Sequence, residues 1–375
     1  MPRTPPSRRA VLIFAASSEP DAWQYDHGVS RPEHAATGGA SSLWRVGRSV
    51  TLVVVLATIP VVFIISIAGE NFAFAAVAGA VIGILGVAML HSLRNGLIAV
   101  GVMAVTATVS VLVSPWPLAG AIWLGLCGIG VGLSGLRGWS MLASTIALWC
   151  AFLVVTPTQI GSVAMFEGAE VEFSLRASWS TALAVIVCGC FTALVTPLLL
   201  RGRPQGSPRP PIRPQAAYWM AGGIGMLLFL EAWISLSEYR VPAVHWLMLT
   251  TLMIVQPSTA STIRRSAHRA LGTVAGAGIA VAIVVAGTPL GLRMAIGYVL
   301  LIMAFTVMLS GRSYWMFATF LTPAVILLTE GTANGLDVTA ARLAFTLIGV
   351  LLAFGLVLIV WAVQHGRRGG STAPA

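Results

Sequence analysis

The stretch that decides the fold is Val244–Gly278, VHWLMLTTLMIVQPSTASTIRRSAHRALGTVAGAG. It joins an apolar run to a cluster of cations and then to a second apolar run that is rich in glycine. The cations are Arg264, Arg265, His268 and Arg269. Because charged side chains are costly in hydrocarbon, this cluster predicts a basic, water-facing turn between two membrane helices.

The composition of the whole chain predicts an integral membrane protein. Of the 375 residues, 57% are hydrophobic and only 9% are charged, and the mean hydropathy is +0.89. Soluble domains are about half apolar and about a quarter charged. The net charge of +10 comes from arginine alone, since the chain has no lysine. These arginines punctuate apolar runs instead of gathering on a water-soluble face, so we expect no nucleic-acid partner.

Apolar runs close to the roughly 20 residues that cross a hydrocarbon core as a helix recur along the chain. We expect an all-α polytopic membrane fold with twelve transmembrane helices near 47–68, 71–90, 95–113, 116–134, 139–157, 174–199, 218–237, 242–260, 270–288, 291–309, 314–329 and 340–363. The expected domains are a disordered cytoplasmic tail, a six-helix repeat, a Pro/Arg-rich cytoplasmic linker, a second six-helix repeat and a second disordered tail, at 1–44, 45–200, 201–217, 218–364 and 365–375.

The charges between the runs predict an orientation. Cations fall on every second junction, and most acidic residues fall on the alternate junctions. Loops rich in arginine stay in the cytoplasm. We therefore expect a multi-pass protein of the cell inner (plasma) membrane with both termini in the cytoplasm, to which Arg176, Arg240 and Arg293 are isolated exceptions near outer ends.

The two halves of the chain align with each other at a displacement of 175 residues. Arg94 then falls on Arg269, and SLRNGLIAVGVMAV overlays AHRALGTVAGAGIA. We interpret this as an internal duplication, although two apolar halves punctuated by arginine can also align without common descent. Because each unit has an even number of spans, the two repeats would be parallel, with a pseudo-twofold axis along the membrane normal.

Three segments of the second half resemble a known family. They are HWLMLTTLMIVQPSTASTIRRSAHRALGTVAGA at 245–277, SYWMFATFLTPAVIL at 313–327 and ARLAFTLIGVLLA at 341–353. Together they are similar to the fusaric acid resistance protein-like integral membrane transporter domain of the aromatic acid exporter superfamily. This resemblance implies export of small organic or aromatic acids, or simply an uncharacterised transporter role, and we expect secondary efflux. The first half lacks the Gln-Pro-Ser-Thr run and the doubled arginine, so it is a candidate scaffold.

Polar residues near Pro257 are candidates for substrate binding. Gln256, Ser258 and Thr259 supply hydrogen-bonding groups, and Pro257 lacks a backbone donor. A helix that opens there is tolerated at membrane depth only where its backbone lines a cavity or is packed by protein. His245, at the start of the same apolar run, is a further candidate.

Arg264 and Arg269 are candidates for attracting an anion. We expect the following helix to begin near 269–273, which would place its positive end beside both guanidinium groups. The alternative is that these arginines only fix the topology and bind anionic lipid head groups. For Arg265 we favour this alternative.

Glu231 lies within an apolar run, MLLFLEAWISL, about four residues from the outer end of the seventh expected span. An ionised carboxylate facing lipid costs up to a few kcal/mol, so we expect this side chain to face protein or a wet cavity. Such a group could take up and release a proton, as coupling to a proton gradient requires. The alternatives, which we favour, are an ion pair with Arg240 or Arg293, or a side chain that reaches the interface.

Three further features of the second half bear on its helices. Thr322-Pro323 is a candidate for a second helix break. Arg342 follows Asp337 by five residues, which suggests an ion pair on the outer face. The spacing Gly272-x-x-x-Gly276 is typical of helices that pack closely together.

The sequence carries no motif for enzymatic chemistry. It has no Walker A loop for ATP and no metal-ligand spacing of histidine, so we expect no enzyme and no cofactor. We expect buried thiols at the four cysteines. The expected partners are membrane lipids, a small organic anion, and either a second copy of the chain or an envelope protein. An anion channel and a non-transporting membrane scaffold remain the alternatives to an exporter.

Overall fold

The computed structural model describes residues 39–68, 72–155, 170–199, 211–239, 245–255, 259–309, 313–329 and 343–356, with residues 340 and 358. All regular structure within these ranges is helical. The α-helices are α1 (Gly39–Ala68), α2 (Ala73–Leu90), α3 (Leu93–Val113), α4 (Pro117–Ser134), α5 (Ser140–Val155), α6 (Glu170–Leu199), α7 (Pro214–Ile234), α8 (His245–Ile254), α9 (Thr259–Val285), α10 (Leu290–Leu309) and α11 (Tyr314–Thr329). A further helix covers Leu343–Leu356. The 3₁₀ turn η3 (Gly135–Arg137) follows α4, and the π turn η5 (Ser235–Tyr239) follows α7.

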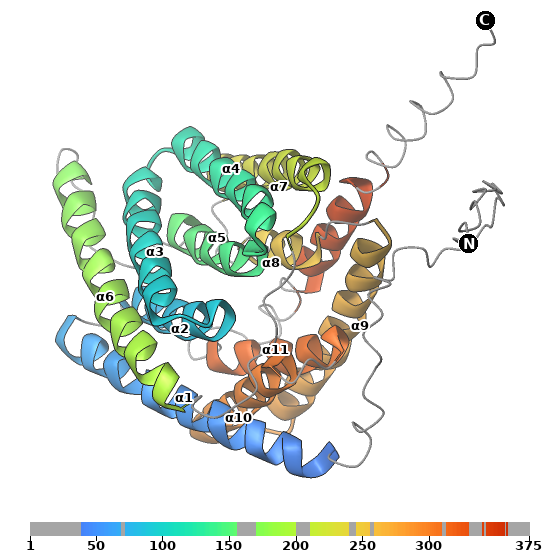
Figure 1. Ribbon diagram of the computed structural model, residues 1–375. Helices are drawn as coiled ribbons and strands as arrows, with labels where there is room; N and C mark the ends of the chain where they lie inside the picture. The colour runs from blue at the N-terminus through green and yellow to red at the C-terminus, as the bar shows by residue number, and fades with distance from the viewer. Residues whose placement is uncertain are drawn as a thin grey trace, which may run out of the picture. The chain divides into compact units, whose positions relative to one another are not determined.

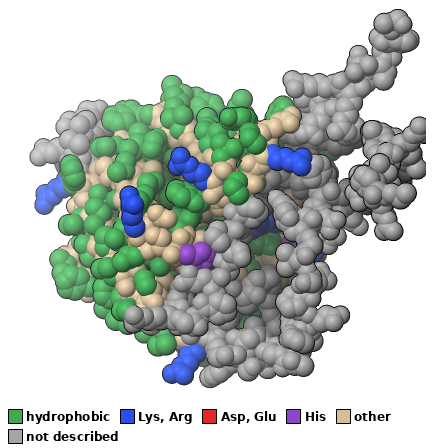
Figure 2. All heavy atoms as spheres, in the orientation of Figure 1, with side chains coloured by type: hydrophobic (Ala, Val, Ile, Leu, Met, Phe, Trp, Pro, Cys, Tyr) green, Lys and Arg blue, Asp and Glu red, His purple; other side chains and the backbone are tan. Residues whose placement is uncertain are grey.

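The helices support a polytopic membrane fold. Eight of the described helices are long and apolar enough to cross a membrane, and α5, α11 and Leu343–Leu356 are shorter apolar helices. Helix α8 has only ten residues. The described surface has many large apolar side chains, and one face shows them with arginines scattered between them (Figure 2). Such a surface suits hydrocarbon better than water.

Close helix packing occurs within the first half of the chain, and also between α4 of the first half and α7 of the second. Helix α2 packs against α6 and α3, and α4 packs against α7 (Figure 1). Glycine permits the close approach of α4 and α7, because a Cβ added to Gly128 would lie only 2.8 Å from the Cα of Gly225. In the second half, α11 packs against both α9 and α10.

An aromatic cluster joins α5 to α8. The ring of Phe152 lies 6.0 Å from that of Phe74, 5.6 Å from that of Trp149 and 5.8 Å from that of Trp246, between centroids. Trp246 is buried, so it faces protein. Aromatic pairs at these separations are worth roughly 0.5–1.5 kcal/mol beyond their buried area. The cluster therefore ties α8, a helix too short to span alone, to the first half of the chain.

The predicted water-facing turn at 264–269 is wrong. Helix α9 begins at Thr259 and runs through the whole cation cluster to Val285, so its start also lies ten residues before the expected Arg269. The segment TASTIRRSAHRAL contains no proline and no glycine, so nothing in its local sequence ends a helix. Helix α8 ends at Ile254 and α9 begins at Thr259. The expected opening at Pro257 lies outside the described residues and stays a prediction.

The predicted break at Thr322-Pro323 is also wrong, because α11 continues through Pro323 to Thr329. A proline removes the hydrogen bond to the carbonyl four residues before it, here that of Thr319. Gly276 of α9 packs on this same carbonyl, since a Cβ added there would lie 2.7 Å from the oxygen. Packing by a neighbouring helix is what allows proline within a membrane helix.

Several expectations fall on residues that the structure does not describe. They include the tails as far as residue 38 and from residue 359, the linker at 201–210, and the outer loop at 156–169. Where the structure resumes, α1 begins at Gly39, eight residues before its expected span, and α7 begins at Pro214, four residues before its own. The twelve-span count and the two-repeat layout stay predictions.

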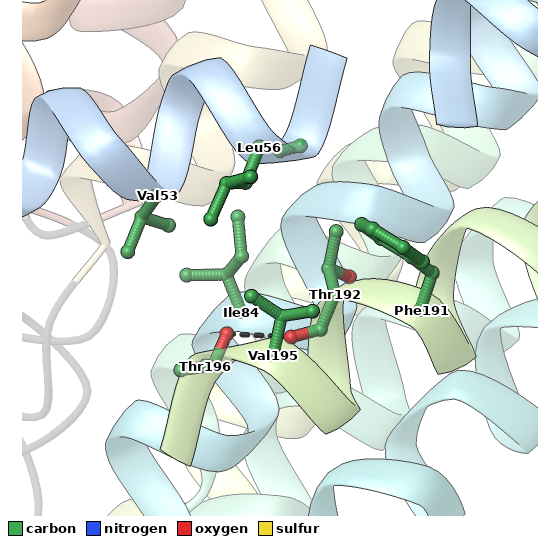
Figure 3. Close-up of a pocket in the computed structure, with 8 residues that line it drawn as sticks. Val53, Leu56, Ile84, Phe191, Thr192, Val195 and Thr196 are labelled. Carbon is green, nitrogen blue, oxygen red and sulfur yellow. Dashed lines mark hydrogen bonds between the residues drawn. The ribbon is translucent and has the colours of Figure 1, made fainter. Parts of the chain in front are cut away.

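A buried hydroxyl on α6 gives a testable contact between helices. The Thr192 hydroxyl is shared between the carbonyl of Ala80 on α2, at 3.0 Å, and that of Cys188 on its own helix, at 2.9 Å. Thr196 donates only within α6, to the carbonyl of Thr192 (Figure 3). We expect Thr192→Val to lower the stability of the purified protein by about 0.6 kcal/mol, and by no more than about 1.7 kcal/mol, as for interhelical hydrogen bonds in membranes generally. Thermal melting in detergent measures this. Thr196→Val is the control, and an equal loss there would show that the contact with α2 contributes nothing.

Candidate functional site: a polar seam between α9 and α11

One face of α9 buries polar side chains. Thr262, Ser266, Arg269 and Thr273 are each at most 5% exposed. Their spacing of four, three and four residues places them along one stripe of the helix. The exposed side of α9 is apolar further along, with Leu271 and similar residues at its surface. The polar stripe of α9 therefore faces protein, and the apolar side of the helix lies at the surface.

Helix α11 covers part of this face at close range. A Cβ added to Gly272 would lie 2.6 Å from the Cβ of Ala318, and one added to Gly276 would lie 2.8 Å from the Cβ of Thr322. The predicted close packing at Gly272-x-x-x-Gly276 is therefore confirmed. It brings Thr322, which is fully buried, beside the stripe on α9.

Arg269 is the largest fully buried side chain among those described, with 1% of its surface exposed. Within the described part of the chain, neither its Nε nor its Nη1 has a hydrogen-bond partner. An unpaired buried charge costs several kcal/mol, so a protein holds one only where something neutralises it. The position therefore demands an anion.

Hydroxyl groups on α9 and α11 share this lack of partners. In the described residues, no partner is found for the hydroxyls of Ser266, Thr273, Tyr314 and Thr322, all of them on α9 or α11. We call Ser266, Arg269, Thr273, Tyr314 and Thr322 the polar seam. Guanidinium and hydroxyl groups are donors that suit carboxylate oxygens, and a guanidinium can bind both oxygens at once.

The other two arginines of the cluster lie differently. Arg264 is exposed, as an arginine that contacts water or lipid head groups would be. Arg265 is half-buried, and its Cζ lies 4.5 Å from the centroid of the Tyr314 ring. This cation–π contact links the start of α11 to α9 and indicates a structural role for Arg265.

The predicted duplication matches Arg94 with Arg269, but the structure places the two differently. Arg94 is exposed and is the second residue of α3, just after the tight turn at His91 and Ser92. Arg269 is buried well inside α9. The first half therefore has no counterpart of the buried guanidinium at this position.

Glu231 lies in the core at a separate place, between α7 and α8. It is 2% exposed, and its Oε1 accepts a hydrogen bond from the hydroxyl of Thr251 at 2.5 Å. Our expectation that it faces protein is confirmed, and the alternative that it reaches the interface is wrong. Arg293 is not its partner in the described residues either, because the second oxygen of Glu231, Oε2, has no hydrogen-bond partner there. The other suggested partner, Arg240, lies outside the described residues.

Of the other predicted site residues, His245 and Thr259 are the first residues of α8 and α9, and their side chains are outside the description. Gln256, Ser258 and Arg342 lie outside the described residues altogether. The structure thus brings Arg269 and Thr322 into one seam, and leaves Glu231 apart from it. Sequence reasoning missed Ser266 and Thr273, which the helical spacing from Arg269 would have indicated.

A small cavity elsewhere in the described residues is apolar. A cavity of about 10 Å³ lies between α1, α2 and α6, with room for about one water molecule (Figure 3). Its two hydroxyls, those of Thr192 and Thr196, are both hydrogen-bonded, and apolar residues line the rest. No group of three or more His, Cys, Asp and Glu side chains that could hold a metal occurs in the described ranges.

Comparison with known proteins gives one relative and one family match. A relative, the Uncharacterized protein YhfK of Escherichia coli (strain K12), is 29% identical over 146 residues, which are 38% of this chain and 20% of that protein. The chain thus matches about a fifth of the relative's length, and no solved structure matches it. Residues 224–356, which include Glu231 and the whole polar seam, match the family described as fusaric acid resistance protein-like, so the resemblance seen in the sequence is confirmed for this part of the chain.

Proposed function

We propose that the protein is a secondary exporter of small organic acids, including aromatic ones, and that Arg269 binds the substrate's carboxylate. The family match over residues 224–356 implies a membrane transporter of the efflux type. The observation that supports the substrate class is the buried guanidinium of Arg269, which has two nitrogens without partners among the described residues.

The apolar surroundings of Arg269 favour this substrate class. A monocarboxylate neutralises one guanidinium, and an aromatic or aliphatic body matches the apolar residues of the two helices, such as Ala277 and Ala318. The hydroxyls of Ser266, Thr273 and Thr322 supply donors for the remaining lone pairs of the carboxylate. Larger polyanions would need more cations than the described seam provides.

We also propose a membrane topology for this exporter. Twelve spans in two parallel six-helix repeats, both termini in the cytoplasm and a location in the inner membrane agree with the positions of the arginines in the sequence. A second copy of the chain or an envelope protein is a further proposed partner. Reporter fusions after residue 375 and within the linker at 201–210 test the orientation, and a periplasmic signal from either position contradicts it.

A growth screen tests the proposed function. Cells that lack efflux of aromatic and fatty acids are compared with and without the protein on a panel of these acids. We expect resistance to at least one acid when the protein is present, and counterflow of that acid into vesicles containing the purified protein. A protein that neither binds nor moves any acid of the panel would instead support the scaffold alternative.

An anion channel is the second alternative, and it differs in its kinetics. A channel passes ionic current in a planar bilayer without a saturating exchange step, whereas an exporter shows saturable counterflow. Because Arg269 lies in a seam where a Cβ has no room on Gly272 or Gly276, the described structure favours an occluded site over an open pore.

A further inference from the structure

Glu231 is the single charged residue of α7. Its carboxyl group is 2% exposed, one oxygen accepts a hydrogen bond from Thr251, and the other oxygen has no partner among the described residues. Apolar side chains that belong to the core cluster flank both residues of the pair: Leu228 and Ala232 on α7, and Met248 and Leu252 on α8. Neither the polar seam nor any other part of the proposed carboxylate site uses this pair.

An ionised carboxylate in such surroundings is costly. One hydroxyl donor satisfies a fraction of its acceptor capacity, and transfer of an unpaired charge from water costs several kcal/mol. The neutral acid is the form that this position accommodates at the lower cost. A group that resides as the neutral acid and can be exposed to water on one side of the membrane is suited to move protons.

The elements packed against α7 offer little to neutralise the carboxylate. Helix α4 has no charged residue in its sequence, and α8 has only His245 at its first position. The titratable groups on these elements and on the two short turns are Cys127, Arg137, Glu238, Tyr239 and His245. Arg137 lies in η3, whose Gly135 accepts a backbone hydrogen bond from Ile212, just before α7 begins. Glu231 lies roughly 26 Å further along α7. The thiol and the phenol offer no positive charge.

We propose that Glu231, held by Thr251 between α7 and α8, takes up and releases a proton in each transport cycle, so that H⁺ is the coupling ion. Its role in transport rests on the proposed export function. Thr251 donates to the carboxylate when the proton has left, and its hydroxyl can rotate to accept the proton's hydrogen bond when the acid is neutral. Helix α8 contacts both sites' helices, because its Thr251 holds Glu231 of α7 and α8 itself packs against α9. It ends at Ile254, three residues after Thr251.

Infrared difference spectra of the purified protein test the proton site without any substrate. Wild-type protein minus Glu231→Gln should show the carbonyl stretch of a protonated carboxylic acid at neutral pH, and this band should disappear as the pH rises. Thr251→Val keeps the carboxyl group and removes its donor, so the band should shift in frequency. If the carboxylic acid band is absent at every pH at which the protein stays folded, the proposal is overturned.

Vesicles containing the purified protein and loaded with labelled benzoate then test coupling. Benzoate counterflow needs no net proton movement, whereas uphill transport driven by a pH gradient does. We expect Glu231→Gln to keep counterflow and to reduce pH-driven transport to the rate of protein-free vesicles. Gradient-driven transport equal to wild type, or loss of counterflow in a folded variant, contradicts a proton-carrying role. Wild-type protein without counterflow of benzoate or any other acid contradicts the export function instead, and the infrared result stands apart from it.

Discussion

Replacement of Arg269 by methionine is expected to abolish organic-acid export while it raises the thermal stability of the protein. Methionine has a similar length and no charge, so it removes a buried guanidinium that has unpartnered nitrogens. Replacing buried charges with apolar side chains of similar size stabilises proteins by about 1–4 kcal/mol in measured cases. Loss of charge-assisted hydrogen bonds, worth about 1.5–3 kcal/mol each, should weaken carboxylate binding at least about 10-fold.

Melting curves with and without an aromatic acid measure both effects in one experiment. A ligand at about 100 times its Kd stabilises the folded state by roughly 2.7 kcal/mol, so wild-type protein should melt higher when benzoate is added. The Arg269→Met protein should melt higher than wild type without benzoate and should show no further shift with it. Arg264→Met on the exposed side of α9 is the matched control, and it should keep the benzoate shift.

The opposite sign of the stability change would be informative. If Arg269→Met lowers the melting temperature, Arg269 has a structural anion partner in the chain, and the seam is not a substrate site. If it raises the melting temperature but keeps the benzoate shift, the acid binds elsewhere. Arg269→Lys should fall between the two proteins in affinity, since lysine keeps the charge but cannot bind a carboxylate through two parallel hydrogen bonds.

Much of the fold could be predicted from the sequence, because most spans are separated by strong local signals. The predicted ends of α4, α10 and α11 lie within about one residue of the observed ones. Local signals mark where these helices begin: Pro117 for α4, the turn before Leu290 for α10, and Arg312 shortly before Tyr314 for α11. The α8–α9 region differs for a physical reason. Hydropathy treats arginine as a residue that must lie in water, whereas a helix can turn arginine toward other protein elements.

The candidate site was predictable only in part. The sequence singled out Arg269, Thr322 and Glu231, and the structure buries all three. It could not show that Arg269 and Thr322 share a seam while Glu231 lies apart, because that depends on which helices pack together. Arg264 and Arg269 illustrate the limit: they are five residues apart in one cation cluster, yet one is exposed and the other is buried, which only the placement of α9 decides.

The close approach of α9 and α11 is expected to be as important for export as the guanidinium itself. Gly276→Val should lower both stability and transport, because its Cβ would lie 2.7 Å from the Thr319 carbonyl and 2.8 Å from the Cδ of Pro323 and the Cβ of Thr322. Forcing extra carbon atoms into a packed interface costs about 1–3 kcal/mol, which corresponds to several degrees of melting temperature. The two helices must separate, and Thr322 then moves away from α9.

Gly278 provides the matched control on the same helix. A Cβ added there meets nothing within 4 Å, so Gly278→Val should melt close to wild type and keep the benzoate shift. Equal losses from both valines would mean that helix propensity, not the seam, determines the effect. Arg269→Met and Gly276→Val therefore form a pair that separates chemistry from architecture. Both should lose export, but the first should gain stability because a buried charge is removed, and the second should lose stability because the seam that holds the charge is opened.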